Sequence, residues 1–234
     1  MRVQGRGLTK PGPSPQLSPR ERGEGARALN LTPFGGLEMR TERLTAFSDG
    51  VIAIIITIMV LELKAPHEAS WSALAPLAPT FLAYALSFAY VAIYWNNHHH
   101  LMHAARFVTG AILWANTTLL FFLSLIPFST AWLSETHFAS VPAALYGVTL
   151  LAPAIAYFIL ARLLIVSGAL EPKVAEAIGK DWKGLISIAL YLAGIATSFA
   201  LPYGAIALYA LVAVMWFIPD RRIEGRIGGA EDAS

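Results

Sequence analysis

Long apolar stretches without a single charge constrain this chain more than any other feature. Three of them cover residues 74–95, 107–132 and 141–161, and a fourth runs for 36 residues from 184 to 219. A helix of about 20 apolar residues spans the roughly 30 Å hydrocarbon core of a bilayer. The stretches therefore predict membrane-spanning helices rather than the core of a soluble domain.

The overall composition supports a membrane location and excludes several classes of function. Apolar residues make up 56% of the chain and charged residues 14%, whereas soluble domains average about 45–50% and about 25%. The net charge of +2 is too small to indicate a nucleic-acid partner. The chain has no cysteine, which excludes disulfides, zinc–thiolate sites and thiol catalysis.

The number of spans follows from the lengths of the stretches. A further apolar segment, Leu44–Leu63, precedes the others and contains only Asp49 and Glu62 as charges. The fourth stretch would be about 54 Å long as one helix, which is too long for one crossing. The sequence Leu-Pro-Tyr-Gly at 201–204 is predicted to break it. We therefore expect an all-α polytopic membrane protein with six transmembrane helices.

The distribution of basic residues predicts the orientation. With six spans, both tails lie on one side together with the connections 96–106 and 162–183. Of the 17 Lys and Arg residues, only Lys64 falls on the opposite side. Loops rich in Lys and Arg remain in the cytoplasm. We therefore expect both termini in the cytoplasm, and a multi-pass protein of the cell membrane.

The two ends of the chain differ from the apolar middle. Residues 1–38 are rich in Gly, Pro, Ser, Arg and Glu, as in KPGPSPQLSPRERGEG. Such a composition buries too little apolar surface to fold, so we predict a disordered tail at 1–38. The transmembrane domain is assigned to residues 39–220, and residues 221–234 form a short cytoplasmic tail.

The first predicted helix has one apolar stripe and one intramembrane acid. An Asp inside a span is costly unless it is paired or faces water. At about 100° per residue, Asp49 lies roughly 140° from Ile54, so it should face neighbouring helices. The stripe on the Ile54 side consists of Phe47, Gly50, Ile54, Thr57, Ile58 and Leu61.

Asp49 has two interpretations. It is predicted to belong to a polar network that fixes the first helix, or it is an ion-coupling carboxylate of a transporter. The network partners expected at the same depth come from the first, second and third helices: Arg43, Ser48, Asn96, His98, His99 and Asn116.

The histidines at 98–100 and 103 raise a metal-site hypothesis. Membrane di-iron enzymes need several histidine boxes on one side, and the chain offers no second box such as H-x-x-E-H there. We therefore predict no metal and no cofactor. The histidines are expected to cap the second helix and to hydrogen-bond to the first. A pH-sensing role stays open because histidine titrates near neutral pH.

Three segments resemble one known family. The motif Arg43-x-x-x-Phe47-Ser48-Asp49, the run YWNNHHHLM at 94–102 and the run ILWANTTLLFFLSLIPFSTAWLSE at 112–135 are similar to the transmembrane protein 175 family of lysosomal and bacterial potassium channels. The resemblance covers residues 40–135, and the last three helices match it in hydropathy alone.

The resemblance implies a homotetramer whose first helices line a central pore. The family's constriction then falls on Ile54, Ile58 and Leu61, and its hydroxyl layer falls on Thr57. These positions lie on the stripe that helical geometry selects. No Thr-Val-Gly-Tyr-Gly filter occurs in the chain. An apolar ring of this kind can gate by dewetting.

The expected function is a potassium-preferring cation channel with a hydrophobic constriction. Its partners would be potassium ions, the lipid bilayer and three further copies of the chain, with no nucleic acid. The alternative is a proton- or ion-coupled secondary transporter that uses Asp49. An enzyme is not expected, because the chain shows neither a ligand set nor a nucleophile–base pair.

Overall fold

The computed structural model describes residues 41–179 and 182–217, so the predicted tails at 1–38 and 221–234 lie outside the described residues. These ranges contain helices and connecting turns, with no strand among them. The helical elements are α1 (Thr41–Val60), the 3₁₀ helix η1 (Trp71–Leu77), α2 (Ala78–His103), α3 (Gly110–Leu123), α4 (Ile126–Glu135), α5 (Ser140–Val166), α6 (Pro172–Gly179), α7 (Trp182–Ser198) and α8 (Pro202–Phe217).

The elements form the six expected crossings. Four apolar helical segments of the described chain are long enough to span a bilayer, at Thr41–Val60, Trp71–His103, Gly110–Glu135 and Ser140–Val166. The last two crossings, α7 and α8, are 17 and 16 residues long. They are separated at residues 199–201, where the predicted breaker lies, and Pro202 begins α8. The fold class is therefore confirmed.

The third crossing differs from the expected uninterrupted helix at 107–132. It is divided at Ser124 and Leu125 into α3 and α4. Pro127 lies in the first turn of α4. Proline has no N–H group and its ring blocks the carbonyl four residues earlier, which disfavours an uninterrupted helix at this position.

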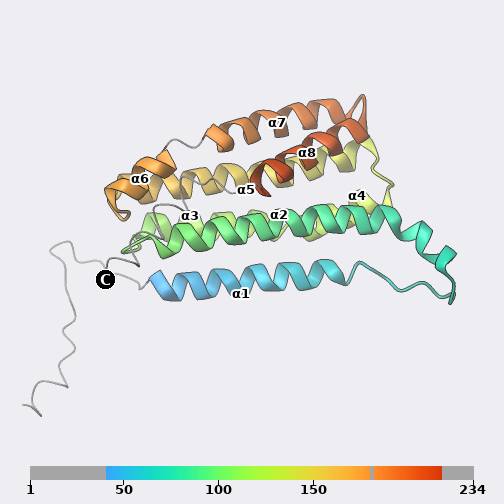
Figure 1. Cartoon of the computed structure of the whole chain (residues 1–234), viewed down its shortest axis with the longest axis horizontal. Helices are drawn as coiled ribbons and strands as arrows, with labels where there is room; N and C mark the ends of the chain where they lie inside the picture. The colour runs from blue at the N-terminus through green and yellow to red at the C-terminus, as the bar shows by residue number, and fades with distance from the viewer. Residues whose placement is uncertain (1–40, 180–181, 218–234) are drawn as a thin grey trace, which may run out of the picture. The chain divides into compact units, whose positions relative to one another are not determined.

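The packing places α1 and the α7–α8 hairpin on different sides of the bundle (Figure 1). Helix α1 packs against α2, α3 and α4. Helices α7 and α8 pack against each other and against α5, and α8 also contacts α2. Helix α2 therefore contacts α1 and the α7–α8 hairpin.

A tyrosine fixes the hairpin on α5. Tyr209 of α8 is fully buried, and its hydroxyl donates to the carbonyl of Ala143 at 3.3 Å. Its ring reaches Gly147 of α5 and Gly194 of α7, where a Cβ atom would overlap with it. Glycine at these two positions lets the three helices approach closely, as small residues do between membrane helices.

Candidate pore face and polar network

Helix α1 has one face buried in the subunit. The buried side chains recur every three or four residues, which is the spacing of one helix face. Each is at most 3% exposed, and together they contact α2, α3 and α4: Leu44, Ser48, Ile52, Ile55 and Met59. This face fixes the rotation of α1 about its axis.

The opposite face of α1 is apolar and uncovered. Ile54 is 58% exposed, and Ile58 and Phe47 are also exposed. Leu61 is 73% exposed and lies in the turn directly after α1. Thr57 is exposed between them, and its hydroxyl donates to the carbonyl of Ile54 at 2.9 Å. All members of the predicted stripe therefore point away from the rest of the described subunit. An apolar face of this kind meets lipid, another subunit or a pore.

A groove borders the uncovered face. It has a volume of about 490 Å³ and lies between α1 and the junction of α3 with α4. Ile54 and Ile58 line one wall, and Ser124 and Phe128 line the other. The division of the third crossing thus shapes the surface beside the stripe.

A buried hydrogen-bond chain anchors α1. The Ser48 hydroxyl donates to the carbonyl of Leu44 at 2.9 Å, so it can accept from the Asn116 amide group, which lies 3.0 Å away. The Asn116 side-chain oxygen then faces His98 Nε2 at 2.6 Å. Because that oxygen can only accept, Nε2 carries the proton. These hydrogen bonds link three membrane crossings, because Ser48 lies on α1, Asn116 on α3 and His98 on α2.

The structure brings together three of the predicted network residues but gives Asp49 another partner. Ser48, His98 and Asn116 form the buried chain, whereas Asp49 is half-buried and accepts a hydrogen bond from the Trp95 indole at 3.0 Å. Adjacent residues of a helix point about 100° apart. Ser48 therefore points into the buried hydrogen-bond chain, and the adjacent Asp49 points to the side of it.

The remaining predicted network residues lie at the periphery. Arg43 and Asn96 are exposed. His99 is half-buried, and its ring lies between those of Trp95 and His103, with centroid distances of 5.7 and 6.0 Å. Within the described residues, no group of three His, Asp or Glu side chains is placed to hold a metal ion.

Sequence reasoning did not assign Trp95 to the network. The available signal was its helical spacing, because Trp95 precedes His98 by three residues and His99 by four. Residues three or four apart lie on one helix face. The indole N–H of a tryptophan can donate the hydrogen bond that a carboxylate such as Asp49 accepts.

The fold and this site together define a multi-pass helical membrane protein whose first helix is anchored by a polar chain and uncovered on its apolar face. The profile of the family described as endosomal/lysosomal potassium channel TMEM175 matches residues 43–127. A potassium channel of Chryseobacterium sp. (strain P1-3) is 56% identical over 186 residues, which cover 80% of this chain and 97% of that protein. The chain therefore belongs to the TMEM175 family.

Two further similarities agree with this assignment. A potassium channel of Streptomyces collinus (strain DSM 40733 / Tue 365) is 35% identical over 123 residues, 49% of this chain and 60% of that protein. The crystal structure of a lysosomal potassium-selective channel TMEM175 homolog from Chamaesiphon minutus superposes with a TM-score of 0.67 at 33% identity. That match covers 76% of this chain and 96% of the other. The family is one of ion channels and not of enzymes, as the sequence predicted.

Proposed function

We propose that this protein is a potassium-preferring cation channel, assembled as a homotetramer with both tails in the cytoplasm. The observation that carries the proposal is the uncovered apolar face of α1, beside the buried face that fixes the helix. The names of the relatives, which are potassium channels, support the choice of ion. In this arrangement the first helices of four subunits surround the pore.

The constriction consists of apolar rings contributed by Ile54, Ile58 and Leu61. The Ile54 and Ile58 rings lie four residues apart along α1, which is about 6 Å at 1.5 Å per residue, and Leu61 follows in the turn after α1. Narrow apolar rings exclude water, so an ion that crosses them must lose part of its hydration shell. Potassium holds its hydration less strongly than sodium, and the rings therefore favour potassium without a carbonyl filter.

Thr57 supplies a polar layer between the apolar rings. Its hydroxyl proton is engaged by the carbonyl of Ile54, so the hydroxyl oxygen presents lone pairs outward. Four such oxygens can contact a partly dehydrated cation. These contacts would lower the free-energy barrier for a cation that passes between the apolar rings.

The buried chain has a positioning role in this proposal. Ser48 ties α1 to Asn116 of α3, and His98 ties Asn116 to α2. A rotation of α1 that moved Ile54 out of the pore would also pull Ser48 away from Asn116. These hydrogen bonds therefore hold the constriction residues at a fixed rotation of α1 within each subunit.

Flux measurements on reconstituted protein test the proposal. Ile54→Asn makes the ring wettable, so we expect faster resting potassium flux and a reduced preference for potassium over sodium. Val60→Asn is the matched control, because Val60 is also exposed on α1 but points about 120° away from Ile54. Ile55 cannot serve as a control, since it is buried and its substitution by Asn would place an amide in the core.

Two results would contradict the proposal. Equal effects of Ile54→Asn and Val60→Asn would show that the stripe does not line the pathway. Transport that saturates and moves a second ion in fixed proportion would identify the coupled transporter instead.

A further inference from the structure

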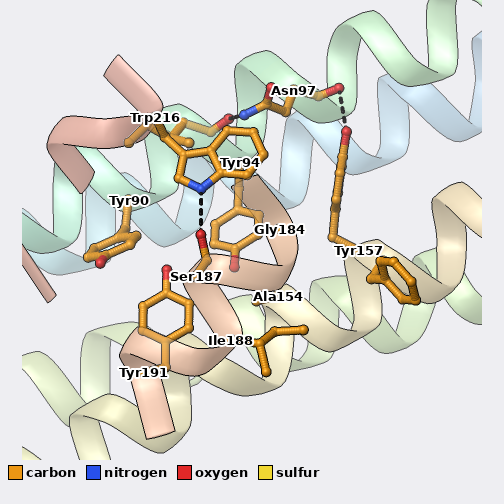
Figure 2. Close-up of a pocket in the computed structure, with 12 residues that line it drawn as sticks. Tyr90, Tyr94, Asn97, Ala154, Tyr157, Gly184, Ser187, Ile188, Tyr191 and Trp216 are labelled. Atoms are coloured by element: carbon orange, nitrogen blue, oxygen red, sulfur yellow. Dashed lines mark hydrogen bonds between the residues drawn. The ribbon is translucent and has the colours of Figure 1, made fainter. Parts of the chain in front are cut away.

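A small cavity lies inside the subunit, away from the α1 face. It is lined by residues of α2, α5, α7 and α8 and has a volume of about 40 Å³ (Figure 2). Most of its wall is apolar, with aromatic rings from several helices. Polar groups also reach it, among them Tyr90, Tyr94, Asn97, Ser187 and Tyr191.

Two polar side chains at the cavity are not fully satisfied by their hydrogen bonds within the described part of the protein. The Tyr94 hydroxyl donates to the carbonyl of Leu150 at 3.4 Å, which is longer than the 2.5–3.0 Å typical of O–H···O hydrogen bonds. Asn97 donates from Nδ2 to the carbonyl of Ile93 at 2.9 Å. Its amide oxygen has no hydrogen bond within the described residues. Tyr94 and Asn97 therefore offer a weakly bound hydroxyl and a free acceptor at one cavity.

The wall of the cavity formed by α7 is polar because of Ser187. Ser187 donates to the carbonyl of Lys183 at 2.8 Å and accepts from the Trp216 indole at 2.9 Å. Its hydroxyl retains one acceptor site. Figure 2 shows Ser187 and Tyr191 of α7 on one side of the cavity and Tyr94 and Asn97 of α2 on another. A molecule between them can bridge the two helices.

The volume decides which molecule fits. A cavity needs about 10–15 Å³ by this measure to hold one water, and a cavity of about 150 Å³ holds benzene. The observed 40 Å³ accommodates two or three waters and excludes an aromatic ligand. Water also needs two to four polar partners, which an apolar void does not supply.

We propose that this cavity is an internal water site of two or three molecules that hydrogen-bonds α2 to α7. One water accepts the hydrogen bond of the Tyr94 hydroxyl in place of the distant Leu150 carbonyl. Another water donates a hydrogen bond to the Asn97 amide oxygen. The site stands independently of the pore, because none of its residues belongs to α1. The water site is nevertheless close to the polar network, because Asn97 directly precedes His98 on α2. One side of α2 therefore faces the water site, and another side carries the buried hydrogen-bond chain.

Hydroxyl-radical labelling by X-ray radiolysis tests the site in the full-length reconstituted protein. Radicals formed from a bound water oxidise the side chains beside it, and ¹⁸O-water mixing reports how fast that water exchanges. We expect oxidation of Tyr94 with slow ¹⁸O uptake. Tyr203 is exposed and should be oxidised with immediate uptake, whereas Tyr146 is fully buried away from the cavity and should stay unmodified.

A cavity-filling variant supplies the second measurement. Ala154 lines the cavity, so Ala154→Val adds two methyl groups to its wall. We expect Tyr94 oxidation to be lost while Tyr203 oxidation is unchanged, and the melting temperature to fall because displaced waters leave polar groups unpaired. A dry void would respond in the opposite way, since filling it restores packing contacts.

Several outcomes would overturn the water site. Tyr94 that stays as unmodified as Tyr146 would show an empty cavity. Uptake at Tyr94 as fast as at Tyr203 would show an open crevice instead of a bound water. Oxidation of Tyr94 that persists in Ala154→Val, or a raised melting temperature of that variant, would also contradict the proposal.

Discussion

The buried chain of Ser48, Asn116 and His98 makes the most specific energetic prediction. Ser48→Ala removes the hydroxyl that accepts from Asn116 and leaves that amide N–H buried without its partner. Asn116→Leu removes both bonds of Asn116 and leaves His98 without a partner at either ring nitrogen, since Nδ1 already has none within the described residues. His98 is 1% exposed, so bulk water cannot replace the lost partner.

The magnitudes follow from the number of bonds lost. Side-chain hydrogen bonds in a membrane protein average about 0.6 kcal/mol and reach about 1.7 kcal/mol, and an unsatisfied buried group adds about 1–3 kcal/mol. We expect a loss of about 1–2 kcal/mol for Ser48→Ala and about 2–4 kcal/mol for Asn116→Leu. In the Asn116→Leu background, Ser48→Ala should cost less than about 0.5 kcal/mol, because no amide remains to be left unpaired.

Thermal stability of the purified protein in detergent measures these differences. For about 150–250 residues, 1 kcal/mol shifts the melting temperature by about 2–4 °C. The double variant Ser48→Ala/Asn116→Leu should therefore melt close to Asn116→Leu alone. A double variant whose shift equals the sum of the two single shifts would refute the coupled chain.

Two further predictions concern packing and the Asp49 contact. Gly147→Ala places a methyl group where Tyr209 packs, so it should destabilise the protein by about 1–3 kcal/mol. Gly50→Ala has open space around it within the subunit and should not lower the melting temperature, because Ala favours a helix more than Gly does. Equal melting temperatures of the two glycine variants would contradict the close approach of α5 and α8. Trp95→Phe removes the indole donor of Asp49 and should lower the melting temperature less than Asn116→Leu, because Trp95 is exposed; a larger loss would place Asp49 at the centre of the network.

The crossings could be predicted because they depend on local sequence. Apolar runs of membrane length determine where helices cross, and the break before Pro202 follows from the chemistry of proline. The division at Ser124 was not predicted, although Pro127 is visible in the sequence. Proline is tolerated within membrane helices when neighbours satisfy the freed groups, so its presence alone does not fix a break.

The site was predictable to the level of a helix face and not to the level of partners. The period of α1 separates Ile54 from Ser48, because these faces differ by more than a right angle. The choice between Ser48 and Asp49 as the buried residue depends on the rotation of α1 against α2 and α3. That rotation is set by packing over the whole interface, which includes Ile52, Ile55 and Met59, and hydropathy does not encode it.

Cysteine accessibility along α1 tests the central claim that the uncovered face lines the ion pathway. The chain contains no cysteine, so single substitutions report without background. In liposomes, a charged thiol reagent should block potassium flux through Ile54→Cys, Thr57→Cys and Leu61→Cys, and potassium at high concentration should slow the reaction at Thr57→Cys. Val60→Cys should react without blocking flux. Block of flux at Val60→Cys with no block at the three stripe positions would contradict the account and place the pathway on another face.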